Sequence, residues 1–343
     1  MIPEVSILMP VRNGEGTVAQ AVESCLAQTF GDFELLLADD GSTDDTAGIL
    51  DRFSRIDRRV RVLRVPAPGG IVAAHTVLTA EARAPLLARM DADDVSRPAR
   101  LERQVAVLWE RPELAGVGSL VRIARRACNG EAEPAEGFLR YQKWLNSLVE
   151  PEEIARERFI ESPVVHPSVT MRRAALDKAG RYRDMPWAED YDLFLRMMAC
   201  GMPLAKVPEV LLDWYDSPGR LTRTDRRYSL ENFLAAKAHF LGRMDAVRRF
   251  GVEISGAGPT GKMLARALLR EAVLVHALYD TSPRRAGTSV AGVPVRGPEE
   301  MGIYTEGAPV QLAAVAQPGR RDVLRELLRG LGYTEGESFY CVA

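Results

Sequence analysis

Residues 84–98, Ala-Pro-Leu-Leu-Ala-Arg-Met-Asp-Ala-Asp-Asp-Val-Ser-Arg-Pro, contain a short apolar run followed at once by three acids, Asp91, Asp93 and Asp94. Turn residues bound the run, which predicts a buried strand that ends at the acids. In open α/β sheets, ligands bind outside the carboxyl ends of the strands. Carboxylate oxygens suit Mg²⁺ or Mn²⁺, and such ions bind together with substrate phosphates. The stretch predicts a metal and diphosphate site, although two spaced acids alone are a weak signal.

The residues around this stretch predict a parallel, doubly wound α/β sheet. Apolar runs predict strands at 5–10, 33–38, 60–65 and 84–90, and helical spacing is found at 17–29, up to about 55, and at 71–82. Alternation of strands and helices with short connections is typical of such sheets. Further along, we expect helices at 97–110, 139–148, 151–159 and 189–199, a strand at 115–124 and a polar loop at 129–137.

The chain has 343 residues, which is consistent with more than one domain. A new sheet pattern starts near residue 250, after a helical stretch. We therefore predict a first domain at 1–227, a helical connector at 228–249 and a small Rossmann-like domain at 250–343.

Composition narrows the class of protein. A net charge of −2 and a pI near 6.2 give no general attraction to nucleic acid. Cys25, Cys128, Cys200 and Cys341 are scattered, which indicates neither a zinc site nor a disulfide framework. No apolar run approaches the roughly 20 residues that span a bilayer. We predict a cytoplasmic protein and leave peripheral membrane attachment and homo-oligomer formation open.

Polar residues also follow the first two predicted strands. Pro10, Arg12 and Asn13 lie at the end of the first, and Asp39 and Asp40 at the end of the second. A carboxylate there can accept a hydrogen bond from a base N–H or a ribose hydroxyl, while the first loop closes over the base. The alternative is turn and helix-cap chemistry in Asp-Asp-Gly-Ser-Thr-Asp. The neighbouring acidic motif favours the nucleotide.

Four motifs in order give the chain a family resemblance. They are Val-Ser-Ile-Leu-Met-Pro-Val-Arg-Asn at 5–13, Glu-Leu-Leu-Leu-Ala-Asp-Asp-Gly-Ser-Thr-Asp at 34–44, Met-Asp-Ala-Asp-Asp at 90–94 with Arg97-Pro98, and Ala-Glu-Asp-Tyr-Asp-Leu at 188–193. Together they resemble family 2 glycosyltransferases of the GT-A fold, over about residues 3–240. The resemblance implies a nucleotide-sugar donor, with a UDP-sugar as first choice, and Mn²⁺ or Mg²⁺. It also implies inverting displacement onto a saccharide, lipid-linked or protein acceptor in polysaccharide or glycoconjugate assembly.

Specific roles follow from the same resemblance. Asp39 resembles the uracil or ribose contact, Asp91 the donor-side aspartate and Asp93 the metal ligand. An inverting transferase needs a carboxylate that takes the proton of the acceptor. The family pattern places this base at Asp190, and Glu189 is expected to orient or contact the acceptor. Both acids would also stabilise the first turn of a helix without any catalytic role.

The segment 211–223 contains further candidates. Family members often carry an Arg-x-His element here, and some use the histidine as a metal ligand. This chain lacks that histidine, and Asp216 is the nearby candidate ligand. Arg220 and Arg223 are expected to close over the diphosphate, with a solvated basic loop as the alternative. His166 is interpreted as a structural hydrogen-bonding residue.

The C-terminal region contains a Gly-x-Gly-x-x-Gly pattern at Gly256, Gly258 and Gly261, between a predicted strand and a predicted helix. Asp280 follows the next strand, 24 residues after Gly256. This is the context of a dinucleotide-binding fingerprint. A bound dinucleotide is one possibility, and a module for docking or dimerisation is the other. The region lacks a credible Tyr-x-x-x-Lys pair, which would provide proton transfer for redox chemistry.

Two other functions remain open from the sequence. A sugar nucleotidyltransferase would also use acids and a metal, and it would consume a triphosphate. A NAD-linked oxidoreductase or binding protein would be centred on the C-terminal domain.

Overall fold

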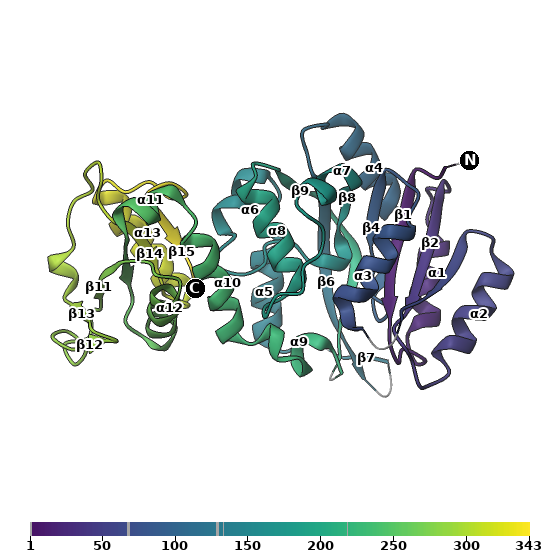
Figure 1. Cartoon of the computed structure of the whole chain (residues 1–343), viewed down its shortest axis with the longest axis horizontal. Coiled ribbons are helices and arrows are strands. Elements are labelled where there is room, and N and C mark those ends of the chain that lie inside the picture. Colours follow the sequence, from purple (N-terminus) through teal and green to yellow (C-terminus); the bar gives the residue numbers. More distant parts are fainter. Residues whose placement is uncertain (1, 67–68, 128–129, 133, 218) are drawn as a thin grey trace. The chain divides into compact units, whose positions relative to one another are not determined.

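The computed structural model describes residues 2–66, 69–127, 130–132, 134–217 and 219–343 (Figure 1). Its segments form two compact units. The first unit contains the chain up to Ile154, Val164–Met185 and Glu189–Arg220, and the second contains Ala155–Pro163, Pro186–Ala188 and Leu221–Ala343. The domain boundaries expected from the sequence remain a prediction, and Cys128 lies outside the described residues. Among the described helices, none has the length and apolar character needed to cross a membrane.

A mixed sheet forms the centre of the first unit. Its strands are β1 (Val5–Val11), β2 (Phe33–Asp39), β3 (Val60–Arg64), β4 (Leu86–Arg89), β5 (Val95–Ser96), β6 (Gly116–Ala127), β7 (Gly130–Ala132), β8 (Thr170–Arg172) and β9 (Leu204–Asp216). They follow the order β3-β2-β1-β4-β8-β6-β9-β5, with β7 paired to β6. The strands β1 to β4 are parallel, whereas β8 runs antiparallel to both β4 and β6. The predicted α/β class is confirmed, and the first four strands are parallel as expected, whereas the sheet as a whole is mixed because β8 and β5 pair antiparallel with their neighbours.

Helices cover both faces of this sheet. They are α1 (Val18–Leu26), α2 (Thr46–Ile56), α3 (Gly70–Glu81), α4 (Arg100–Glu110), α5 (Glu136–Asn146), α6 (Pro151–Glu157), α7 (Arg173–Lys178) and α8 (Glu189–Ala199), with a 3₁₀ turn at His166–Ser168. Alternate residues of a strand point to opposite faces. Accordingly, Ile7 and Leu35 pack with α1, α2 and α4, whereas Leu8 and Leu36 pack with α3, α7 and α8. Burial on both faces explains why the central strands are continuous apolar runs.

Two local expectations differ from the structure. Within the predicted polar loop 129–137, Gly130–Ala132 forms β7 and pairs with Arg125–Ala127 at the end of β6. The predicted helix from residue 97 begins at Arg100. Helical backbone geometry is disfavoured at Arg97 because Pro98 follows it. The Arg97 amide instead donates to the Leu211 carbonyl, at an N···O distance of 2.9 Å.

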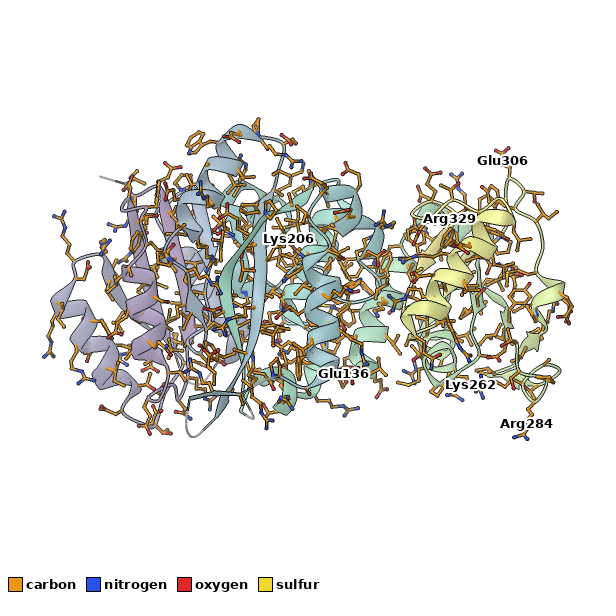
Figure 2. All side chains as sticks on the ribbon, turned by 180° about the vertical axis from the view of Figure 1, so that it is seen from behind. Glu136, Lys206, Lys262, Arg284, Glu306 and Arg329 are labelled. Atoms are coloured by element: carbon orange, nitrogen blue, oxygen red, sulfur yellow. The ribbon has the colours of Figure 1, made fainter. Side chains whose placement is uncertain are left out.

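Charged side chains of both units are mostly at the surface, with Glu136, Arg284 and Glu306 as labelled examples (Figure 2). Lys206 on β9 is an exception, because it is buried and its Nζ donates to the Leu145 carbonyl oxygen at 2.6 Å. Burial lowers the pKa of Lys206 to about 7. A buried amine of this kind binds the C-terminal end of α5 to the sheet.

The second unit has a sheet of its own. Its strands are β10 (Val252–Ser255), β11 (Val275–Tyr279), β12 (Ser289–Val290), β13 (Val293–Arg296), β14 (Val310–Ala313) and β15 (Phe339–Cys341), in the order β12-β13-β11-β10-β14-β15. All pairings except β12 with β13 are parallel. The helices are α9 (Leu221–Thr224), α10 (Leu230–Leu241), α11 (Asp245–Phe250), α12 (Pro259–Arg270) and α13 (Pro318–Gly330), with 3₁₀ turns at Arg226–Tyr228 and Pro298–Glu300.

The predicted glycine fingerprint follows β10 and extends into the first turn of α12, which contains Gly261. Gly256 has a φ of 117°, a conformation that L side chains rarely adopt. A Cβ atom on Gly261 would lie 1.8 Å from the Gly256 carbonyl oxygen, whereas one on Gly258 would meet nothing within 4 Å. Asp280 accepts hydrogen bonds from the amides of Ala257 and Ser282, both at 2.9 Å. These contacts give Gly256, Gly261 and Asp280 a structural role in the turn, and a bound nucleotide remains a prediction.

The two glycines provide a matched test of this role. Gly261→Ala should lower the free energy of unfolding of the second unit by about 3 kcal/mol, because its methyl group would overlap a backbone oxygen. Gly258→Ala should stay within about 0.5 kcal/mol of the wild type. Urea unfolding of the full chain measures both, and limited proteolysis assigns the loss to residues 221–343. Equal stability of the two variants would contradict the close approach of α12 to the β10 turn.

Candidate functional site

The sheet order places three of the predicted groups at one edge. Strands β2, β1 and β4 are neighbours and run in the same direction. Their carboxyl ends carry Asp39–Asp40, Pro10–Asn13 and Asp91–Asp94, respectively. The first unit therefore brings the predicted nucleotide and metal residues of these loops to the same edge.

The loops after β1 and β2 are joined through Asn13. Its backbone amide donates to Ser42 Oγ at 3.0 Å, and its side-chain Oδ1 accepts from the Thr43 backbone amide at 2.8 Å. Asn13 has a φ of 50°, and asparagine tolerates this left-handed region better than most residues. These hydrogen bonds of Asn13 therefore join the loop after β1 to the loop after β2.

Asp39 and Asp40 are both buried and bonded to the surrounding loops. Asp39 forms an ion pair with Arg64 and accepts from the Ser42 amide at 3.0 Å. Asp40 accepts from the amides of residues 69 and 70 at 2.7 and 3.0 Å, and Arg12 lies 3.8 Å from its Oδ2. The two carboxylates thus position backbone at the edge, and contact with a nucleotide remains a prediction.

Asp91, Asp93 and Asp94 form an acidic cluster after β4. Each offers an oxygen atom, and these atoms lie within 4.8 Å of one another. Asp94 is fully buried; its Oδ1 accepts from the Tyr215 amide at 2.8 Å, whereas its Oδ2 has no hydrogen-bond partner among the described residues. An unsatisfied buried acceptor costs about 1–3 kcal/mol, and more for a charged group. The clustered oxygens and this orphaned atom fit a divalent cation.

Asp94 was absent from the ligands predicted from the sequence, and Asp216 was included. Within the described part of the chain, the acids that come together after β4 do not include Asp216. Asp216 ends β9, and its charge acts on Arg220. The position of Asp94 beside Asp93 was the only sequence signal for its part in the cluster, because burial depends on distant segments.

Arg220 is the cation that faces all three acids. Its guanidinium nitrogens lie 3.4 Å from an oxygen of Asp91 and 4.0 Å from oxygens of Asp93 and Asp94. Its Nη1 also donates to the Tyr215 carbonyl oxygen at 2.8 Å. Antiparallel pairing of β5 with β9 brings this segment to the acids. Arg223, the second predicted diphosphate contact, lies in α9 of the second unit.

Burial and charge have opposite effects on this cluster. Burial raises the pKa of Asp93 and raises that of Asp94 well above its usual range, while the Arg220 charge counteracts both shifts. Burial alone would lower the pKa of Arg220, but the carboxylates outweigh it and the net pKa is raised. The acids therefore favour the charged form of Arg220, whereas burial still favours the protonated forms of Asp93 and Asp94 despite the Arg220 charge.

Glu189 and Asp190 begin α8 in the same unit. Glu189 is buried, and Asp190 is partly exposed and accepts from the Tyr191 amide through Oδ1 at 2.7 Å. Desolvation, followed by the neighbouring Glu189 charge, raises the pKa of Asp190 to about 7. A carboxylate with a pKa near the working pH is suited to general-base catalysis.

Arg89 connects this helix end with the acidic cluster. It is buried, lies 2.5 Å from an Asp91 oxygen, and its charge lowers the pKa of Asp190. The Asp91 charge also acts on Asp190, so the two acids interact electrostatically. Arg89 was not among the site residues predicted from the sequence, although it ends β4 and lies two residues before Asp91.

Comparison with known sequences gives a family match and related glycosyltransferases. Residues 6–180, which are 175 of the 343 residues, match the profile described as Glycosyl transferase family 2. Over 278 residues the chain is 29% identical to "Putative glycosyltransferase EpsE" of Bacillus subtilis (strain 168), covering 79% of this chain and 92% of that protein. Over 195 residues it is 29% identical to the O-antigen biosynthesis glycosyltransferase WbnJ of Escherichia coli, covering 57% and 71%.

Solved structures share the fold at low sequence identity. TarS 1–349 of S. aureus in complex with UDP-GlcNAc matches with a TM-score of 0.52 and 17% identity, over 78% of this chain and 72% of that chain. The mannosyltransferase PcManGT from Pyrobaculum calidifontis in complex with GDP-Man and Mn²⁺ matches with a TM-score of 0.50 and 16% identity, over 79% and 74%. At this identity the likeness concerns the fold alone.

The position of Arg220 predicts competition with a metal ion. Arg220→Met should bind Mn²⁺ at least about 10-fold more tightly in the absence of any nucleotide, because a positive charge next to the ligands has been removed. Arg97→Met is the control, since Arg97 pairs with Asp213, outside the cluster, at 2.9 Å. Calorimetric titration with MnCl₂ measures the affinities. Unchanged or weaker Mn²⁺ binding by Arg220→Met would contradict the prediction.

Proposed function

The chain belongs to glycosyl transferase family 2 and is a glycosyltransferase with the GT-A fold, and we propose that it is a metal-dependent inverting enzyme. It would move a sugar from a nucleotide-diphosphate donor to an acceptor hydroxyl. The observation that carries this proposal is one arrangement in the first unit. Three clustered carboxylates follow β4, and Asp190, with a pKa near 7, interacts electrostatically with one of them.

Asp91 and Asp93 are the residues that we propose to hold the metal, with Asp94 beside them. The orphaned Asp94 oxygen and the spacing of the three acids support this assignment. The presence of Mn²⁺ in the PcManGT complex also favours a divalent ion. Bound there, Mn²⁺ or Mg²⁺ would neutralise negative charge on the leaving diphosphate.

The loops after β1 and β2 are the proposed nucleotide site. Pro10, Arg12, Asn13, Asp39 and Asp40 would hold the base and ribose. The donor we favour is a UDP-sugar, in line with the UDP-GlcNAc complex of TarS, whereas the PcManGT complex contains GDP-Man. The identity of the nucleobase in the donor should therefore be measured directly.

We assign binding of the negatively charged diphosphate to arginine side chains. Arg220 already faces the acidic cluster, so a small rotation of its side chain would let it bind phosphate oxygens when a metal binds the acids. The diphosphate contact expected of Arg223 from the sequence remains a prediction. Bidentate geometry makes arginine well suited to phosphate.

The proposed chemical step is a single displacement. Asp190 removes the proton of the acceptor hydroxyl while its oxygen attacks the anomeric carbon, and the bond from that carbon to the diphosphate oxygen breaks on the opposite side. The nucleoside diphosphate leaves with the electron pair of that bond. Glu189 is proposed to orient the acceptor.

The acceptor class is proposed from the relatives. The name of the WbnJ relative includes O-antigen biosynthesis, which favours a saccharide or lipid-linked acceptor in polysaccharide assembly. For residues 250–343 we propose nucleotide binding or docking without redox chemistry. Screening UDP-sugars and GDP-sugars for metal-dependent hydrolysis without an acceptor would identify the donor.

Metal removal is the first test of the proposal. EDTA should abolish sugar transfer, and added Mn²⁺ or Mg²⁺ should restore it. Asp93→Asn should lower the rate on the order of 10³-fold, because a metal ligand in a partly dry site would be lost. Full activity of Asp93→Asn in metal-free buffer would exclude the assignment.

Asp190→Asn separates donor binding from chemistry. The variant should bind the nucleotide sugar with nearly wild-type affinity, while turnover falls roughly 10²–10⁴-fold, as expected when a general base is lost. Asp177→Asn is a control, because Asp177 is at the surface in an ion pair with Arg181. Calorimetry with the donor and initial rates give the two quantities. Loss of donor affinity with preserved turnover would show that Asp190 is not the base.

A further inference from the structure

His75 is a buried polar residue that the proposed reaction does not use. It lies on α3, its residue is 0% exposed, and neither ring nitrogen has a hydrogen-bond partner among the described residues. Each unsatisfied buried nitrogen costs about 1–3 kcal/mol. A leucine at this position would avoid the cost, since Ala74 and Leu78 on the same helix face are apolar and buried. The imidazole therefore lacks a hydrogen-bond partner that the described residues could supply, and a bound ligand would satisfy it.

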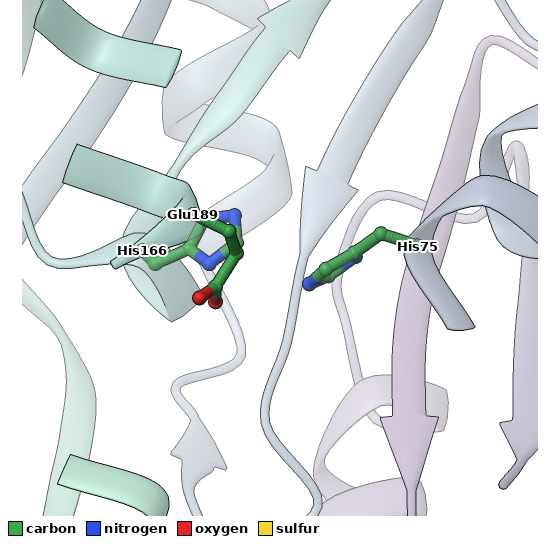
Figure 3. A group of neighbouring side chains, drawn as sticks. All are labelled: His75, His166 and Glu189. Carbon is green, nitrogen blue, oxygen red and sulfur yellow. The ribbon is translucent and has the colours of Figure 1, made fainter. Parts of the chain in front are cut away.

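Two further potential ligands lie next to it. His166 comes from the 3₁₀ turn at His166–Ser168 and Glu189 from the first turn of α8, and both are buried. The imidazole centroids of His75 and His166 are 5.1 Å apart. One ligand atom of each of the three residues lies within 4.8 Å of the others. Figure 3 shows the His75 ring directed toward the other two side chains, which come from separate elements.

The charge state of the three groups suits a cation. Burial, together with the Arg89 charge, lowers the pKa of both histidines well below the usual range, so the rings are neutral and keep a lone pair. Glu189 supplies a carboxylate. The Arg89 guanidinium opposes a further cation, but it is paired with Asp91 at 2.5 Å.

Tyr182 adds a supporting contact. Its hydroxyl lies 2.7 Å from His166 Nε2, and its ring stacks on His75 with centroids 4.3 Å apart. If Nε2 carries the proton, this hydrogen bond fixes the tautomer that leaves Nδ1 of His166 available. Metal-binding histidines are commonly oriented in this way by a hydrogen bond at the other ring nitrogen. The hydrogen bond thus agrees with the structural role predicted for His166 and also prepares it as a ligand.

We propose that His75, His166 and Glu189 form a second divalent-metal site, separate from the acidic cluster after β4. Two imidazoles and one carboxylate are a known donor set for Zn²⁺, with a fourth position for water. Ligand atoms around tetrahedral Zn²⁺ are about 3.3 Å apart at the usual bond lengths, so the three side chains need only move inward slightly. Nitrogen ligands favour Zn²⁺, Co²⁺ or Ni²⁺ over Mg²⁺. The ion would join α3, the 3₁₀ turn and α8. One Glu189 oxygen would bind it and leave the other oxygen for the proposed acceptor contact, and metal binding without substrate tests the site apart from the reaction.

Metal binding to the full-length protein tests this site. The protein is stripped with chelator, saturated with Mg²⁺ to occupy the acidic cluster, and titrated with Zn²⁺ or Co²⁺. We expect one tightly bound ion per chain, visible d–d absorption for Co²⁺, and an increase in Tm. His75→Leu should weaken Zn²⁺ binding at least about 100-fold, since loss of even an outer contact costs 10–100-fold. The matched control is His276→Leu, because His276 is exposed on β11.

Two further variants distinguish the proposed site from the acidic cluster and from a folding defect. Asp91→Asn/Asp93→Asn removes the acidic cluster and should retain the Zn²⁺ site, which separates the two centres. His166→Gln should weaken Zn²⁺ binding in the same way as His75→Leu, so a folding defect in one variant does not decide the outcome. Absence of tight Zn²⁺ binding in the wild type, or binding that both histidine variants retain, would overturn the proposal.

Discussion

The contact between Arg220 and the acids after β4 is the interaction on which the candidate site depends. Burial would drive protons onto Asp93 and Asp94, and the guanidinium counteracts this at distances of 3.4–4.0 Å from the three acids. A second buried cation, Arg89, pairs with Asp91 and acts on Asp190. Arg220 and Arg89 therefore reduce the cost of charging the buried carboxylates, but they do not cancel it, since the net pKa of Asp93 and of Asp94 is still raised. A divalent cation bound at the three acids would favour their charged forms further.

The strand order of the sheet brings the residues of the candidate site together. Parallel β2, β1 and β4 deliver their loops to one edge, and Asn13 and Asp40 fix those loops through backbone hydrogen bonds. The short β5 then pairs with β9, which brings Tyr215 and Arg220 to the acids. Residues more than 100 positions apart in the sequence thus meet because of strand order, and the loops can be short because the scaffold aligns them.

Many strands and the sheet edge that carries the site were predictable from local sequence patterns. The features that were not predictable depend on contacts between distant segments. The apolar runs and the acids at 91–94 predicted the strands and the edge, because burial on both faces and strand direction leave a signature in the sequence. The ranking of Asp94 and Asp216 was not predictable, since only the pairing of β5 with β9 decides which acid is buried. His75 had no sequence signal either: one histidine on an apolar helix face becomes a potential ligand only where α3, the 3₁₀ turn and α8 meet. The inclusion of Ala155–Pro163 in the second unit also depends on long-range contacts, such as the ion pair of Glu157 with Arg325.

In the proposed reaction, Asp190 activates an acceptor hydroxyl for a single displacement of the nucleoside diphosphate. The most direct measurement is the anomeric configuration of the first product, observed by proton NMR immediately after transfer from a donor of known configuration. With an α-linked nucleotide sugar, a single displacement gives a β-linked product. An α-linked product would contradict it, because retention requires either two successive displacements or a front-face mechanism in which Asp190 does not act as this base.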